Sequence, residues 1–262
     1  SAISHGSGDG TAFDITNVEV DDSSGSCFDF PTDAVVTMLE VDLDGCNTGG
    51  SASGGAIVND GGSSAGSMAL TNLTIVDSYV NLVVTDLDEV TIDSLHASHS
   101  ATQSGSALSV AGSTLAVDSM SADDYSSASI ETTGTYSMND VDLGDANLAI
   151  APGGTMSTAN GAYGDDAMME DVVAGALSMA RTAPDMRNVD LSGVLTVSGT
   201  SPTTDSQDGR NVDAAGVNFI GCGYSYHFTS MDIGDGTADA YVSSSCSSSN
   251  APNTLIIDGG TI

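Results

Sequence analysis

Short apolar pairs, separated by a single residue, recur along the whole chain and constrain its fold more than any other feature. In residues 70–95, "LTNLTIVDSYVNLVVTDLDEVTIDSL", Leu73-Thr74-Ile75 leads to Asp77-Ser78, and Val90-Thr91-Ile92 leads to Asp93-Ser94. Alternation of this kind turns one side of a short strand inward, and the acidic residues that follow are typical of turns. The pairs recur at spacings from about 14 to 25 residues, centred near 20, which is the period of a solenoid.

The pairs can be followed from one end of the sequence to the other. They are Val18-x-Val20, Leu39-x-Val41, a weaker one at Ile57, Leu73-x-Ile75, Val90-x-Ile92, Leu115-x-Val117, Tyr136-x-Met138, Met156-x-Thr158, Leu177-x-Met179, Leu195-x-Val197, Val217-x-Phe219 and Leu255-x-Ile257, with another near Tyr241. A second apolar pair often precedes the first, and a glycine frequently separates the two, at Gly112, Gly134, Gly154 and Gly193. Because glycine adopts backbone angles closed to other residues, we expect these positions to be bends between two strands of one coil.

A single coil of this kind cannot bury its apolar side alone, whereas stacked coils form a continuous core. The sequence therefore predicts an all-β fold: a single-stranded right-handed parallel β-helix of roughly 12 coils of about 20 residues, on the order of 60 Å long. We expect one domain over residues 1–262, belonging to a longer polypeptide because the strand pattern runs into "LIIDGGTI". A β-sandwich is the competing fold, although it predicts more Asn-Gly hairpin turns. Residues 165–180 fit either a short helix or a coil.

The charge of the chain is extreme, with 36 acidic residues, no lysine and three arginines, Arg181, Arg187 and Arg210, for a net charge of −33. Phosphate contacts need Lys or Arg, so nucleic acid and anionic membranes are disfavoured as partners. Self-repulsion of this size requires screening by salt or divalent cations, which predicts a saline or marine setting. No membrane-spanning stretch occurs, so no membrane insertion is expected.

The four cysteines form two close pairs, Cys27 with Cys46 and Cys222 with Cys246, which are 19 and 24 residues apart. Each separation is about one coil, so equivalent positions on neighbouring coils come within reach of a disulfide. We therefore predict two disulfides, each joining one coil to the next. Disulfides indicate an oxidising environment, outside the cytoplasm or at the cell surface.

Residues 53–78, "SGGAIVNDGGSSAGSMALTNLTIVDS", carry a Gly-Gly-Ala-Ile phrase at Gly54–Ile57, followed by an aliphatic strand at Leu70–Ile75. This stretch resembles the GGAI-type repeats of polymorphic outer-membrane adhesins and related β-helical surface proteins. The tight match covers about a tenth of the chain. The resemblance implies a β-helix with a secreted or surface-exposed role, and it carries over no catalytic residue.

Two acidic turns are candidate Ca²⁺ sites. "DLDGCN" offers Asp42, Asp44 and Asn47, and "DVDLGDAN" offers Asp140, Asp142, Asp145 and Asn147. Alternating oxygen ligands around a glycine turn are what a hard cation binds. The alternative for each is an Asx-rich turn without an ion.

The catalytic motifs known from β-helical polygalacturonases are absent from the sequence. Neither their Gly-His-Gly motif nor their Arg-Ile-Lys motif occurs. Acidic pairs that could hydrolyse a glycoside are too abundant in this chain to be informative. Tyr224 and Tyr226 could form a sugar-stacking patch, and the alternative is that they cap the end of the core.

These observations favour a non-enzymatic structural or adhesive module of an extracellular or cell-surface protein, of which a filament subunit is one form. Its expected partners are further copies of itself or neighbouring domains of the same polypeptide. The alternative is a carbohydrate-active or carbohydrate-binding β-helix resembling polysaccharide lyases or hydrolases, with a polysaccharide as partner.

Overall fold

The computed structural model describes residues 3–4, 11–31, 33–48, 55–59, 66–79, 82–99, 106–132, 136–152, 167–182, 184–199, 206–234, 240–242 and 253–261. Every regular element in these residues is a β-strand. None of them belongs to a helix, and accordingly no helical segment suited to crossing a membrane is found among them.

The strands are β1 (Ile3–Ser4), β2 (Ala12–Ser23), β3 (Phe28–Phe30), β4 (Val35–Cys46), β5 (Ile57–Asn59), β6 (Ser67–Val76), β7 (Leu82–Ile92), β8 (Leu95–Ser98), β9 (Ser106–Val117), β10 (Met120–Asp123), β11 (Ser127–Thr132), β12 (Tyr136–Asp142), β13 (Asn147–Pro152), β14 (Met168–Ala174), β15 (Leu177–Ala180), β16 (Asp185–Ser198), β17 (Gln207–Phe219), β18 (Ser225–Ile233), β19 (Ala240–Val242) and β20 (Thr254–Asp258). They form one 20-stranded sheet, and the strand pairings in it are parallel.

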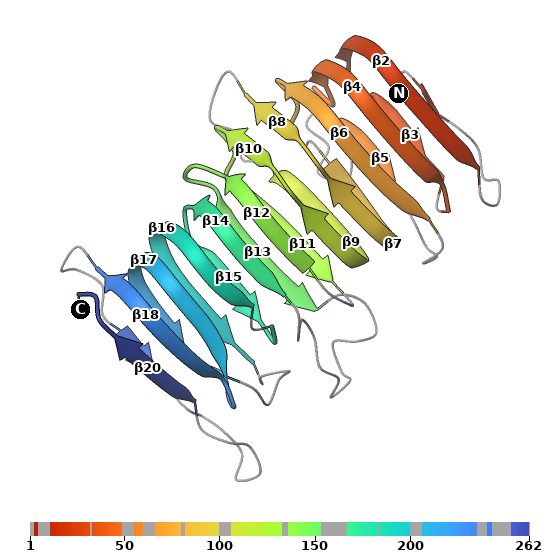
Figure 1. Cartoon of the computed structure of the whole chain (residues 1–262). Coiled ribbons are helices and arrows are strands. Elements are labelled where there is room, and N and C mark those ends of the chain that lie inside the picture. The colour runs from red at the N-terminus through yellow and green to blue at the C-terminus, as the bar shows by residue number, and fades with distance from the viewer. Residues whose placement is uncertain are drawn as a thin grey trace.

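Two ladders of stacked strands make up this sheet (Figure 1). The long ladder runs through β2, β4, β6, β8, β10, β12, β14, β16, β17, β18 and β20, and the short ladder runs through β1, β3, β5, β7, β9, β11, β13 and β15 and continues through the second parts of β16 and β17 to β19. The strands β16 and β17 pair with both ladders and join them, as do β7 and β9. We call each level of a ladder a rung. All-parallel rungs stacked along one direction are consistent with the predicted solenoid.

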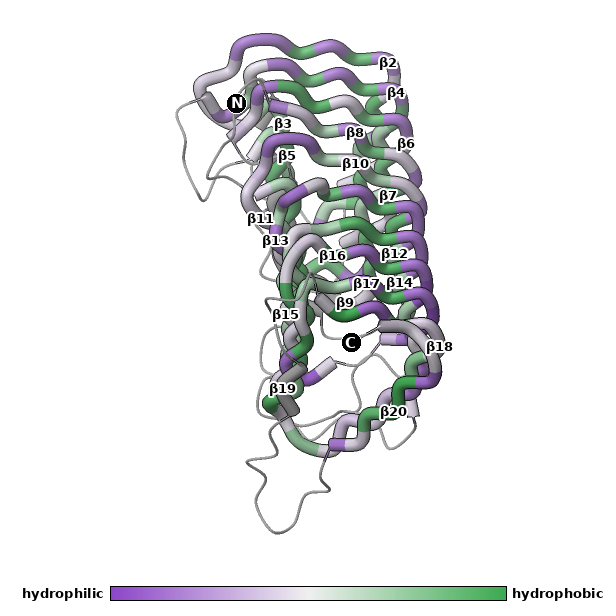
Figure 2. Tube along the Cα trace, turned by 90° about the vertical axis from the view of Figure 1, so that its left-hand side faces the viewer, coloured by the Kyte–Doolittle hydropathy of each residue, from purple (hydrophilic) through white to green (hydrophobic). Residues whose placement is uncertain are grey.

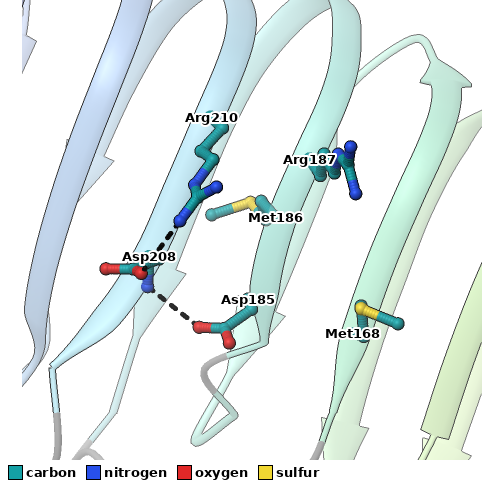
Figure 3. Close-up of a pocket in the computed structure, with 6 residues that line it drawn as sticks. All are labelled: Met168, Asp185, Met186, Arg187, Asp208 and Arg210. Atoms are coloured by element: carbon teal, nitrogen blue, oxygen red, sulfur yellow. Dashed lines mark hydrogen bonds and ion pairs between the residues drawn. The ribbon is translucent and has the colours of Figure 1, made fainter.

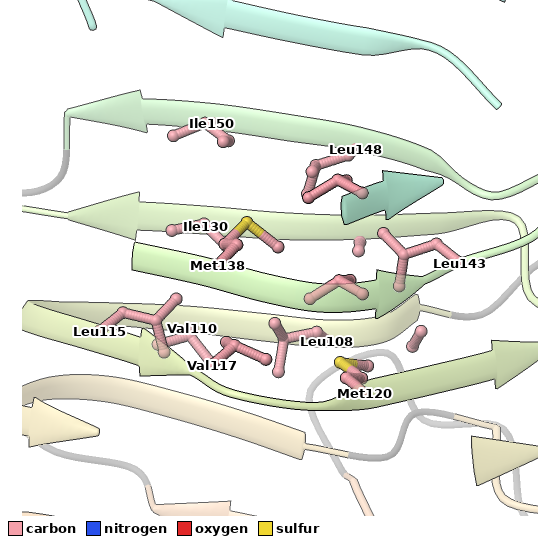
Figure 4. Packing of buried hydrophobic residues seen from close by; sticks show 14 of the residues in the cluster. Leu108, Val110, Leu115, Val117, Met120, Ile130, Met138, Leu143, Leu148 and Ile150 are labelled. Carbon is pink, nitrogen blue, oxygen red and sulfur yellow. The ribbon is translucent and has the colours of Figure 1, made fainter. Parts of the chain in front are cut away.

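Alternation of apolar and polar residues explains why the strands stack in register. Val41, Leu73, Leu95, Met120 and Val141 are register partners on successive rungs, and none is more than 3% exposed. The alternation is visible along strands of the long ladder such as β2 and β4 in Figure 2, and Figure 4 shows buried side chains from neighbouring strands packed against one another. Burying an aliphatic side chain contributes about 1.5–3 kcal/mol, so each added rung extends the same core.

A bend divides the strands of the long ladder at one residue, whose backbone lies in the left-handed region. We call this column the Asx corner; it comprises Asn17, Glu40, Asn72, Asp140, Asp171, Asn188, Asn211 and Ser230, with φ between 49° and 62°. Asn and Asp tolerate this conformation better than most residues. The corner residue and the one before it both face outward, so two exposed residues interrupt the alternation in strands such as β4.

Side chains along the Asx corner also bond to one another. The Asn188 amide donates to Asp171 Oδ1 at 2.7 Å, and the Asn211 amide donates to Asn188 Oδ1 at 3.0 Å. The corner is therefore tied together from rung to rung outside the apolar core.

This corner corrects one detail of the predicted coil. The predicted pair Leu39-x-Val41 straddles the corner: Leu39 is 36% exposed, and the inward pair is Val41 with Leu43. The glycines at which bends are expected lie where a long strand passes between ladders. Gly193 lies inside β16 at a register shift, between the part that pairs with β14 and the part that pairs with β15, and Gly112 ends the part of β9 that pairs with β11. A side chain on Gly193 would approach Gly175 O to within 2.7 Å, so this glycine permits close contact between rungs. Gly134, Gly154 and the pair at Met156 lie outside the described residues.

The remaining pairs are inward-facing where described, but they belong to three different places in the coil. Leu73-x-Ile75 comes directly after the Asx corner residue of β6. Val90-x-Ile92 pairs with Met68 and Leu70, which come before that corner residue. Leu177-x-Met179 lies in the short ladder. The ambiguous segment 165–180 forms β14 and β15 rather than a helix.

The predicted disulfide between Cys27 and Cys46 is confirmed, with a Cα–Cα distance of 5.6 Å. Both cysteines are fully buried. Cys222 is also disulfide-bonded, while its predicted partner Cys246 lies outside the described residues.

Removing the first disulfide with the double substitution Cys27→Ala/Cys46→Ala is expected to lower the free energy of unfolding by about 3 kcal/mol, because closing a loop of 19 residues restricts the unfolded chain. Urea unfolding of the variant and the parent chain measures the difference. Equal unfolding midpoints would show that the bond contributes nothing to stability.

Candidate functional site

Two of the three basic residues of the chain lie side by side on the outer face of the long ladder. Arg187 in β16 and Arg210 in β17 are register partners, and their side chains are 61% and 64% exposed. Figure 3 shows both guanidinium groups on neighbouring strands. Like charges directly opposite each other on a sheet are destabilising, so this placement needs compensation.

Carboxylates next to the two arginines supply part of that compensation. Arg187 Nη1 lies 3.0 Å from Glu170 Oε1, and Arg210 Nη2 lies 3.8 Å from Asp208 Oδ2. The Asp208 amide in turn donates to Asp185 Oδ1 at 2.9 Å. Each guanidinium group has five N–H donors, so these contacts leave most of the donors facing solvent.

A shallow depression of about 170 Å³ lies between these side chains and is also lined by Met168 and Met186. Met168 is 46% exposed, although Met186 belongs to the core. The depression therefore combines two cations, two carboxylates and one accessible apolar side chain. The surface can exchange hydrogen bonds and ion pairs with a partner, but it is too open to enclose a substrate.

A four-residue motif that occurs twice in the sequence places the two arginines opposite each other. Arg-Asn-Val-Asp occurs at residues 187–190 and again at 210–213, and the two copies stack in register. In each copy the arginine precedes the Asx corner, the asparagine occupies it, the valine enters the core and the aspartate lies on the other side. This signal lies in the polar positions of the coils, whereas the repeat that predicts the fold lies in the apolar positions.

Carboxylates stack from rung to rung on the side of the Asx corner opposite the two arginines. We call these two sides the flanks of the corner. Asp190, Asp213 and Asp232 are register partners on successive rungs, all exposed. Neighbouring strands lie ~4.8 Å apart, so these carboxylates have the same axial spacing as the two arginines.

The first predicted Ca²⁺ group is only partly brought together. Asp42 and Asp44 face solvent on β4, beside their register partners Glu19 and Asp21 on β2. Asn47, in contrast, is 1% exposed and does not share this face.

In the second predicted Ca²⁺ group, several oxygens already accept hydrogen bonds. Asp142 Oδ1 accepts from the Gly144 amide at 2.9 Å, Asn147 Oδ1 accepts from the Ala176 amide at 3.0 Å, and Asp140 Oδ2 accepts from Ser119 Oγ at 3.4 Å. Asp145 is exposed. Across the part of the chain that the structure describes, no three His, Cys, Asp or Glu side chains form a metal-binding group. Calcium binding stays a prediction.

The predicted sugar-stacking tyrosines are interior residues. Tyr224 and Tyr226 are both fully buried, and Tyr226 stacks on Phe228 with ring centroids 5.3 Å apart. Neither ring is accessible to a sugar, so the stacking interpretation is wrong and the core interpretation holds. The physical reason is their position: Tyr226 occupies an inward position of β18, and the Tyr224 hydroxyl donates to Ser198 O at 2.6 Å.

Burial raises the pKa of Tyr136, Tyr224 and Tyr226 above the ordinary value of tyrosine. A group whose pKa is raised in the folded state contributes stability that is present below its unfolded pKa, about 10, and is lost as the pH rises above it. We expect stability to fall above pH ~10 by on the order of 1 kcal/mol per pH unit for each tyrosine. Near-ultraviolet absorbance of tyrosinate, followed together with circular dichroism, tests this. Complete tyrosine ionisation in a chain that keeps its β-sheet spectrum would contradict it.

Asp77, Ser78 and His99 are the residue types of a hydrolytic triad, but their geometry does not form one. His99 Nδ1 lies 3.6 Å from Asp77 Oδ1, and the His99 ring packs edge-on against Tyr125. Ser78 is fully buried, and Tyr125 donates a hydrogen bond to its carbonyl oxygen at 2.9 Å. A nucleophile has to be exposed to its substrate, so this cluster is structural.

Comparisons of the chain with models of known protein families, with curated protein sequences and with solved structures found no match.

Proposed function

We propose that this chain is a non-enzymatic structural or adhesive module of an extracellular or cell-surface protein, in which coils stack end to end into a longer rod. In this proposal the fold is a right-handed parallel β-helix of roughly 12 coils. A right-handed coil is proposed because nearly all crossover connections between parallel strands are right-handed. The resemblance of residues 53–78 to adhesin repeats supports the same role.

The proposal is carried by one observation: on the outermost described rungs, apolar side chains that point inward are only partly buried. Phe13 and Ile15 in β2 point toward the core but are only partly buried, whereas Val36 and Met38, their partners on β4, are at most 1% exposed. At the other end, Leu255 and Ile257 in β20 are likewise only partly buried. Val18 and Val20 complete the partly covered surface of β2.

The two ends are complementary because every rung uses the same register. Following the long ladder, Leu255 occupies the column of Phe13, and Ile257 occupies the column of Ile15. A further coil of the same design on either end would cover these side chains and pair the open strand edge. That coil belongs either to a neighbouring segment of the same polypeptide or to a second copy.

Electrostatics sets the conditions for such stacking. A net charge of −33 opposes association until salt or divalent cations screen it. A depression of about 370 Å³ near the β2 end is lined by Asn17, Val18, Glu19, Glu40 and Asp42. In the proposal, Ca²⁺ attracted to such carboxylates reduces the repulsion between ends.

A matched pair of substitutions on β20 tests the end contact. Ile257→Glu introduces a charge on the partly buried inward face, and Ile256→Glu introduces the same charge on the outward face of the same strand, where the side chain is 48% exposed. Sedimentation velocity in saline buffer should show end-to-end oligomers for the parent chain and for Ile256→Glu, and the loss of these end-to-end oligomers for Ile257→Glu. Circular dichroism confirms that both variants remain folded. Identical sedimentation of all three chains would contradict an end-to-end contact.

A further inference from the structure

The Asx corner carries opposite charges on its two flanks at the rungs formed by β16 and β17. Arg187 and Arg210 occupy one flank, and Asp190 and Asp213 occupy the other, all four exposed. The corner itself holds Asn188 and Asn211, which are uncharged. This part of the surface is therefore complementary to itself.

We propose that Arg187 and Arg210 bind Asp190 and Asp213 of a second copy, so that two rods associate side by side. Consider two parallel rods related by a two-fold axis along their length, with their Asx corners facing. The rotation preserves height along the axis and exchanges the flanks, so it places Arg187 of each copy opposite Asp190 of the other, and Arg210 opposite Asp213. Because the arginines and the aspartates are register partners on the same rungs, their spacings match.

Charge on the remaining rungs agrees with the same arrangement. From β2 to β18, no described rung carries an acidic residue both at the position directly before the corner and at the second position after it, which are the two outward positions nearest the corner. The facing pairs instead include Asp93 with His96, Asn139 with Asp142, and Thr229 with Asp232. In a chain with 36 acids, this distribution lets two copies approach along the corner without placing acid against acid across the flanks.

The closest like charges lie on the corner itself, where Glu40, Asp140 and Asp171 of one copy approach the same residues of the other. Asp171 is held by its hydrogen bond from Asn188, one rung away from the arginines. The contact is consequently sensitive to salt: moderate ionic strength screens the net repulsion, whereas contact ion pairs persist. A convex corner buries little area, so the association is a weak one.

Charge reversal tests this proposal. At about 0.15 M ionic strength, where the Debye length is about 8 Å, sedimentation equilibrium gives the dimer dissociation constant and small-angle X-ray scattering gives the cross-section. Lateral pairing thickens the rod, whereas end-to-end stacking lengthens it, so failure of this inference and failure of the proposed function are distinguishable. Arg187→Glu/Arg210→Glu makes both flanks acidic and is expected to raise the dissociation constant of the lateral dimer on the order of 100-fold.

The complementary variant provides the decisive control. Asp190→Arg/Asp213→Arg makes both flanks basic and should also fail to pair with itself, but an equimolar mixture of the two variants should restore a lateral heterodimer. Cooperative thermal unfolding of each variant, together with a β-sheet circular dichroism spectrum equal to that of the parent chain, excludes misfolding as the cause. A parent chain without lateral dimers, or a mixture that does not recover them, would overturn the proposal. So would a parent chain that remains thin but binds polygalacturonate through these arginines, since that outcome assigns the site to an acidic polysaccharide.

Discussion

Replacing Gly209 by alanine is expected to lower the free energy of unfolding by about 3 kcal/mol, the upper part of the usual range for overpacking a core. Gly209 occupies an inward position in β17 between Met186 and Phe228, its register partners on the neighbouring rungs. A methyl group at this position would collide with the Phe228 ring, which is fully buried and stacked on Tyr226. The ring has no space to withdraw into, so the strands themselves must separate. For a chain of this size the unfolding temperature should fall by about 10 °C.

Two further variants isolate the cause. Gly144→Ala adds a methyl group where the nearest atom, Ala122 O, lies 3.9 Å away, so it tests the cost of alanine at φ +53° alone, about 1 kcal/mol. Phe228→Leu makes room beside residue 209. The double variant Gly209→Ala/Phe228→Leu should therefore be more stable than the sum of its single substitutions predicts. Strict additivity would show that Gly209 and Phe228 are not coupled.

Stability should rise strongly with salt. Four register pairs place carboxylates opposite each other on the outer face, namely Glu19 with Asp42, Asp21 with Asp44, Asp190 with Asp213, and Asp213 with Asp232. Each like-charge pair costs roughly 0.2–1 kcal/mol, so together they cost on the order of 1–4 kcal/mol when unscreened. Between about 0.01 M and 1 M NaCl the Debye length falls from about 30 Å to about 3 Å. We expect the unfolding temperature to increase by on the order of 10 °C over this range.

Neutralising one carboxylate separates this effect from general effects of salt on the core. Asp213 lies between two acidic partners, whereas Asp14 pairs with Thr37 on β4. Asp213→Asn should raise the unfolding temperature at low salt and have little effect at high salt, and Asp14→Asn should change it less. An unfolding temperature that does not depend on salt would show that the carboxylate ladders do not oppose folding.

The all-β class and the stacking of parallel rungs were predictable from the sequence because side-chain alternation is a local property. Leu73 and Ile75 alternate with polar residues, and that pattern alone places them inside. The Asx corner was not predictable in the same way. A bend at Asn72 or Glu40 depends on one backbone angle, and alternation analysis treats the residues on both sides of it as one strand. This is why Leu39 was expected in the core and lies outside.

The disulfide between Cys27 and Cys46 could be predicted because its separation equals the coil period. The burial of Tyr224 and Tyr226 could not, since an aromatic residue near a cysteine is equally compatible with a surface patch. The contact between the two arginines could be predicted only with the strand register. Arg187 and Arg210 are 23 residues apart, and the alignment of β16 with β17 brings them together. A comparison of the polar positions of successive coils would have revealed the repeated Arg-Asn-Val-Asp phrase.

Electron microscopy of the purified chain in saline buffer, with Ca²⁺ and with a calcium chelator, tests the central claim most directly. If coils stack end to end, the images should show filaments with an axial repeat on the order of 60 Å for roughly a dozen rungs. Chelation should shorten or disperse them if Ca²⁺ relieves the repulsion between ends. Single short rods under both conditions, at every concentration examined, would contradict a role in end-to-end assembly.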